Sequence, residues 1–155
     1  MIKLNGLLQG DLFLEDRKLK ELRQLITEIE VNAERDQLGE RDRLLERNRQ
    51  VYRFQTLKKE VILPTLRTLM LDFDRKGHLT RLWEKTPEKL RFDLQLQTRV
   101  PKRGAIEISL DPKEPRIKVE YGWSTGAREE ETYPLDAVQP SFMTDRMMHL
   151  LRGLV

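Results

Sequence analysis

The sequence predicts an α+β protein in which a long N-terminal helical arm precedes a four-stranded antiparallel sheet and a C-terminal helix. Apolar residues recur every three or four positions early in the chain and every second position from Leu90 onward. The first spacing places side chains on one face of a helix, and the second places them on one face of a strand. We expect residues 1–63 to form the arm and residues 64–155 to form a small α+β domain.

The arm opens with an amphipathic helix that starts near Asp11. Neither Gly nor Pro interrupts the chain from there to Ala33, and the apolar positions are separated by three, four or seven residues. A stripe of this kind needs an apolar partner surface. Its members are Leu12, Leu19, Leu22, Ile26, Ile29 and Ala33.

The charged segment around Gly39 leaves two structures open for the arm. The apolar stripe lapses from Arg35 to Arg43 and resumes at Leu44. If Gly39 ends a helix, two helices fold back as an antiparallel hairpin, but a helix that continues through Gly39 would form a coiled coil between two chains. We favour the hairpin, because a single chain can then bury its own apolar seam. Charged residues at its tip could dock a partner, and the candidates are Arg43, Arg47, Arg49 and Arg53.

The domain should begin with a short helix after Pro64. Proline either kinks the preceding helix or opens a new one, and the apolar face from Leu66 to Phe73 supports a helix that ends near Gly77. The segment that follows is ambiguous, and we interpret Thr86 as the cap of a short helical turn.

Period-two alternation then predicts four strands. Short links rich in Pro, Gly and Asp separate them, which permits antiparallel neighbours and excludes helical crossovers. The sheet should therefore be a meander, covered on its apolar face by the Leu66–Phe73 helix and by a last helix that starts near Ser141. The predicted strands are Leu90–Gln97, Ala105–Leu110, Arg116–Trp123 and Glu130–Leu135.

The overall composition limits the classes of function. The chain of 155 residues carries 29 basic and 26 acidic residues, so it has little general attraction for phosphate or acidic lipid. The absence of cysteine removes disulfides, thiolate catalysis and cysteine-ligated zinc. We see no secretory signal and no apolar run of membrane-spanning length, so we expect a cytoplasmic protein without a membrane partner.

No catalytic, cofactor-binding or metal-binding constellation emerges from the sequence, and we expect no cofactor. The segment from Asp72 matches the opening of a calcium-binding loop, but Lys76 and Trp83 stand where oxygen ligands are needed. His149 shares a predicted helix face with Asp145, and the sequence offers no third ligand within reach. We interpret the pair as a surface feature of the helix.

The predicted function is a non-enzymatic interaction or assembly module that forms a homodimer or docks a protein partner. The arm is longer than so small a sheet requires, and its contact residues would be Leu19, Leu22, Ile26 and Ile29. An enzyme that uses carboxylates and His149 in a cleft beside the sheet is one alternative. The other alternative is a nucleic-acid-binding protein, with a basic cluster formed by Arg99, Lys102, Arg103, Arg116 and Lys118.

Overall fold

The computed structural model describes the backbone of residues 2–155 and the side chains from residue 15 onward, so the predicted position of the Leu12 side chain lies outside the described part. The chain divides into two compact units, and the second begins at Arg47. The first helix, α1, spans Ile2–Leu57. Within the described residues, no helix is both long enough and apolar enough to cross a membrane.

Helix α1 continues through Gly39, so the prediction of a helical hairpin is wrong. Gly39 does not have the positive φ angle that a glycine at a helix C-terminus commonly adopts. A glycine inside a helix costs about 1 kcal/mol relative to alanine. That cost is small beside the hydrogen bonds of a 56-residue helix. The alternating charges that follow Gly39 therefore lie along a helix and do not form the tip of a hairpin.

A wide helical turn accommodates Pro64. The π-helical turn η1 spans Lys58–Ile62, and the backbone N–H of Leu63 donates to the carbonyl of Lys58, five residues earlier. Helix α2 follows over Leu63–Arg75 with proline in its first turn, where a missing N–H costs little. Gly77 then reverses the chain with a φ angle of 81°, which confirms the predicted end of this helix.

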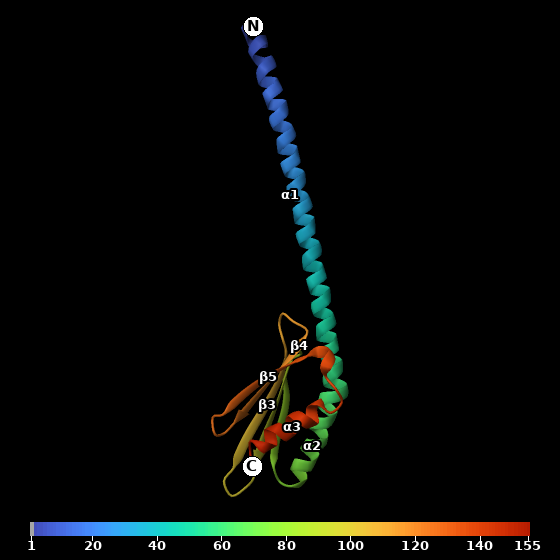
Figure 1. The fold of residues 1–155 in the computed structure, drawn as a ribbon, viewed down its shortest axis with the longest axis vertical. Helices are drawn as coiled ribbons and strands as arrows, with labels where there is room; N and C mark the ends of the chain where they lie inside the picture. The colour runs from blue at the N-terminus through green and yellow to red at the C-terminus, as the bar shows by residue number, and fades with distance from the viewer. Residues whose placement is uncertain (1) are drawn as a thin grey trace. The chain divides into compact units, whose positions relative to one another are not determined.

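The sheet has five antiparallel strands and not the predicted four. Its strands lie in sequence order, so the meander topology is confirmed (Figure 1). Three of the four predicted strands begin or end within a few residues of their expected positions, and the fourth, Arg116–Trp123, has the predicted bounds. The strands are β1 (Leu79–Thr86), β2 (Lys89–Leu96), β3 (Lys102–Leu110), β4 (Arg116–Trp123) and β5 (Arg128–Pro134).

Strand β1 is the strand that the sequence analysis missed. Its apolar residues fall on both faces: Leu82 faces the core, and Leu79 and Trp83 face the opposite side. No period of two is therefore visible in the sequence. The predicted helical turn at Thr86 is instead the start of the tight β1–β2 turn, in which Thr86 pairs with Lys89.

One face of the sheet packs against helices, and Figure 1 shows α2 and α3 on that side. Helix α3 spans Phe142–Arg152 and follows the short 3₁₀ turn η2 at Leu135–Ala137. Alternate residues of β2, β3 and β4 supply the sheet side of the core. We call this the inner face and the opposite side the open face. The helical side of the core includes Phe54, Ile62, Leu66, Met143, Met147 and Leu150.

Candidate functional site

The apolar stripe predicted on the first helix is exposed on α1. Leu19, Leu22, Ile26 and Ile29 have exposed fractions of 48%, 52%, 47% and 66%. Their separations of three, four and three residues, followed by four to Ala33, match the a and d positions of a coiled-coil heptad. We call these five residues the α1 seam.

Two of the four candidate arginines of α1 are engaged inside the second compact unit. Arg47 donates a hydrogen bond to Glu88 at 2.7 Å and another to the backbone of the β3–β4 turn. Arg53 forms an ion pair with the aspartate of η2. These two side chains fasten the last turns of α1 to the domain. Arg43 and Arg49 are exposed. The docking of a partner by these arginines stays a prediction.

Two basic residues of the nucleic-acid hypothesis are paired with carboxylates. Arg116 Nε lies 3.2 Å from Asp111, and Lys118 Nζ lies 3.1 Å from Glu120, which raises the pKa of Lys118. Tyr121 is on the inner face, as predicted, and cannot stack on a base there. The other members of the set, which are exposed, are Arg99, Lys102 and Arg103.

His149 contacts strand β5 and not Asp145. Its Nε2 atom lies 2.5 Å from a carboxylate oxygen of Glu129, and Glu131 is close enough that the three side chains could approach one cation. The alternation Glu129, Glu131, Tyr133 on the inner face of β5 is the sequence signal for this cluster. The sequence analysis missed it because β5 was expected to begin only at Glu130.

A cation from the protein already occupies one side of this cluster. The Arg146 guanidinium lies 2.6 Å from Glu131, which also accepts hydrogen bonds from the hydroxyls of Tyr121 and Tyr133. Burial raises the pKa of Tyr121, against the opposing charge of Arg146, so the phenol stays a neutral donor. The arrangement is well explained as a polar clamp that holds α3 against the edge strand.

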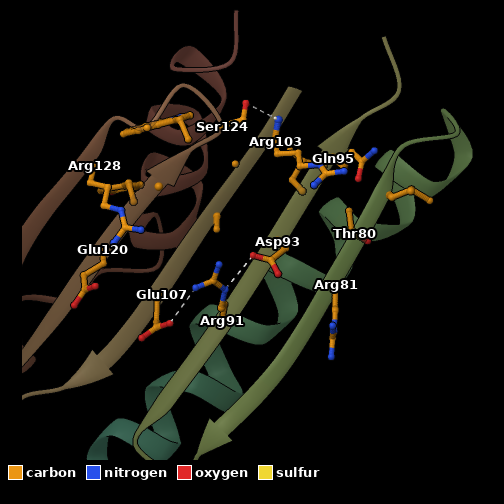
Figure 2. Close-up of a pocket in the computed structure, with 18 residues that line it drawn as sticks. Thr80, Arg81, Arg91, Asp93, Gln95, Arg103, Glu107, Glu120, Ser124 and Arg128 are labelled. Carbon is orange, nitrogen blue, oxygen red and sulfur yellow. Dashed lines mark hydrogen bonds and ion pairs between the residues drawn. The ribbon is translucent and has the colours of Figure 1, made fainter. Parts of the chain in front are cut away.

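The open face of the sheet carries a hollow at its centre (Figure 2). The strand register places five residues side by side across the sheet, one from each strand: Arg81, Asp93, Ala105, Gly122 and Arg128. Ala and Gly leave a gap between the longer side chains on either side. We call the resulting space, of about 600 Å³, the sheet hollow. Sites for small molecules commonly have volumes of 300 to 1,000 Å³.

The carboxylates that line the sheet hollow all have basic partners. Arg91 Nε lies 3.0 Å from Asp93, and Arg91 NH1 lies 3.5 Å from Glu107. Glu107 is also bound by two lysines, and Glu120 is bound by Lys118. Figure 2 shows Arg91 between Asp93 and Glu107. The negative charge of the hollow is therefore neutralised locally.

No protein-family model, curated protein or solved structure matches the chain.

Proposed function

We propose that this protein is an assembly module that forms a homodimer by pairing the α1 seam of two chains. The observation that carries the proposal is the heptad spacing of Leu19, Leu22, Ile26 and Ile29 together with their exposure. Large apolar side chains that repeat in this way on a long helix are typical of a helix that pairs with another helix.

The change from apolar to charged residues after Ala33 marks the C-terminal end of the proposed interface. After Ala33, the next three a and d positions carry Asp36, Glu40 and Arg43, all of which are exposed. These residues would be costly to bury between two helices without partners. The apolar pairing therefore ends at Ala33.

The apolar area of the seam is of the size that a weak dimer needs. Burying a half-exposed Leu or Ile side chain gains about 1 kcal/mol, so the eight large side chains of two seams gain about 8 kcal/mol. Association costs at least about 4 kcal/mol in lost rotational and translational freedom. Because the surplus is small, two charged residues in the seam should abolish the dimer.

The test compares two double variants that have the same charge change and the same spacing. Leu22→Glu with Ile29→Glu places two carboxylates in the seam. Gln24→Glu with Val31→Glu places them two residues further along, rotated by about 200° to the far side of the helix. Sedimentation equilibrium at high protein concentration gives the molar mass of each, because a surplus of about 4 kcal/mol corresponds to a dissociation constant of about 1 mM.

We expect the wild type and the Gln24/Val31 variant to dimerise and the Leu22/Ile29 variant to be a monomer. Circular dichroism should show that the domain of the monomeric variant remains folded, because the seam lies outside the second compact unit. Equal masses for the two double variants would show that the seam is not the interface, and the proposal would have to be abandoned.

A further inference from the structure

Gly122 opens the floor of the sheet hollow without a structural need for glycine. It lies inside β4, where glycine weakens a strand, and its φ angle is not positive. A Cβ atom at this position would have no heavy atom of another residue within 4 Å, apart from its chain neighbours. An added Cβ atom would therefore fit, and the effect of glycine is to leave space above the sheet. Glycine inside a strand often marks the close approach of a ligand or another chain.

The hollow also holds basic groups that no carboxylate neutralises. Arg103 and Arg128 line it, and neither side chain has an ion pair with the residues that the structure describes. The lining carboxylates, in contrast, are paired with Arg91 or with lysines. The charge available to a ligand is therefore positive. Two guanidinium groups offer several N–H donors with the planar geometry that suits phosphate or carboxylate oxygens.

We propose that the sheet hollow binds a small organic anion that has a flat body and a phosphate or carboxylate group. The flat body lies over Ala105 and Gly122, where two neighbouring strands offer only small side chains. Arg103 and Arg128 are exposed and point apart in Figure 2, and their long side chains turn toward the ligand to hold the anionic group. Gln95 and Ser124 flank Arg103 and supply neutral hydrogen-bonding groups (Figure 2).

The positions of the polar groups explain why a small molecule fits better than a long polyanion. A nucleic-acid strand needs a continuous basic track. Next to the central row, however, Glu107, Glu120 and Glu130 stand side by side on β3, β4 and β5. Lysines pair with all three carboxylates, so the row offers no continuous basic track to a phosphate backbone, but the hollow still has room for a single anionic group.

The test is a titration of the full chain followed by two-dimensional ¹H–¹⁵N NMR. The probes are phenyl phosphate, benzoate and inorganic phosphate, which separate the contribution of the flat body from that of the anionic group. The reporters are the backbone amide of Gly122 and the Nε–H signals of Arg103 and Arg128. We expect saturable shifts at these positions with phenyl phosphate or benzoate, and weaker binding of inorganic phosphate.

Three variants separate a built site from general attraction between charges. Gly122→Val fills the hollow and keeps its charge, whereas Arg103→Gln with Arg128→Gln keeps the space and removes two charges. The control, Arg99→Gln with Lys102→Gln, removes two neighbouring positive charges that do not line the hollow.

We expect both hollow variants to weaken binding by at least about tenfold and the control to bind as the wild type does. The proposal is overturned if no probe gives a saturable shift in the wild type, or if Gly122→Val binds as well as the wild type. It is also overturned if only a single-stranded oligonucleotide shifts the reporter signals, and the control variant weakens its binding as much as the Arg103/Arg128 variant does. That result would indicate a diffuse basic surface.

Discussion

Replacing Gly153 by alanine should destabilise the domain, because Gly153 is the point where the end of α3 meets the indole of Trp123. A Cβ atom at Gly153 would lie 2.8 Å from Cζ2 of Trp123 and closer still to Nε1 and Cε2. The φ and ψ angles of Gly153 are −71° and −14°, which alanine adopts without strain. The effect of the substitution should therefore come from the contact with the indole alone.

The expected loss follows from what holds the indole in place. Trp123 Nε1 donates to the carbonyl of Leu150 at 3.0 Å, and its ring stacks on Tyr121 with 5.8 Å between centroids. Moving the ring breaks the hydrogen bond, at about 1 kcal/mol, and repacks the edge of the core, at about 1–3 kcal/mol. Together these costs predict that Gly153→Ala lowers the free energy of unfolding by about 2–4 kcal/mol.

Urea denaturation followed by circular dichroism measures this loss, and Gly122→Ala is the matched control. Gly122 is also next to Trp123 in the sequence. Apart from its chain neighbours, however, no residue has an atom within 4 Å of a Cβ added at Gly122. We expect the control to unfold at the wild-type urea concentration or slightly above it, because alanine reduces the entropy of the unfolded chain. If Gly153→Ala is within about 0.5 kcal/mol of the wild type, the packing of α3 on β4 described here is incorrect.

Two further predictions concern the polar contacts of the domain. Arg47→Ala should lower the free energy of unfolding by about 1–3 kcal/mol, because the charged hydrogen bonds that join α1 to two β-turns are lost, whereas the exposed Arg43→Ala should have little effect; equal melting curves for the two variants would contradict this role. Burial raises the pKa of Glu107, but its hydrogen bonds and charge interactions with Lys85 and Lys89 outweigh burial and hold the pKa below its usual value. Glu107 therefore stabilises the fold above its unfolded pKa, and this contribution is lost as the pH falls through the folded value. Glu107→Gln should be less stable than the wild type at neutral pH, and the difference should shrink as the pH falls below the unfolded pKa of about 4.3, as measured by urea unfolding across this range. A difference that is independent of pH would show that the carboxylate charge does not matter.

The sequence predicted those elements whose residues alternate in a simple way. Strands β2, β3 and β4 carry apolar residues at every second position, and the last helix has an apolar face that includes Phe142, Met147 and Leu150, all of which are buried. Strand β1 could not be found in this way, because an edge strand with Trp83 on its open face lacks that alternation. Gly39 was misread because a glycine that breaks a helix and one that lies inside a helix look alike in sequence.

The candidate sites depend on the register between strands, which a single sequence does not contain. The exposed residues of the α1 seam were identified from their spacing along one helix. In contrast, the sheet hollow is created by Ala105 and Gly122, which meet only because β3 pairs with β4 in one particular register. The contact between His149 and Glu129 likewise joins a helix to a strand 20 residues away. Such pairs could not be predicted from residue types alone.

Sedimentation equilibrium of the wild-type protein over a wide range of concentrations tests the central claim most directly. Pairing of the α1 seam predicts a mass that rises with concentration from 18.5 kDa toward twice that value, because the estimated surplus of binding free energy is small. A mass that stays at 18.5 kDa at every concentration would contradict the proposal that this protein assembles through its own first helix.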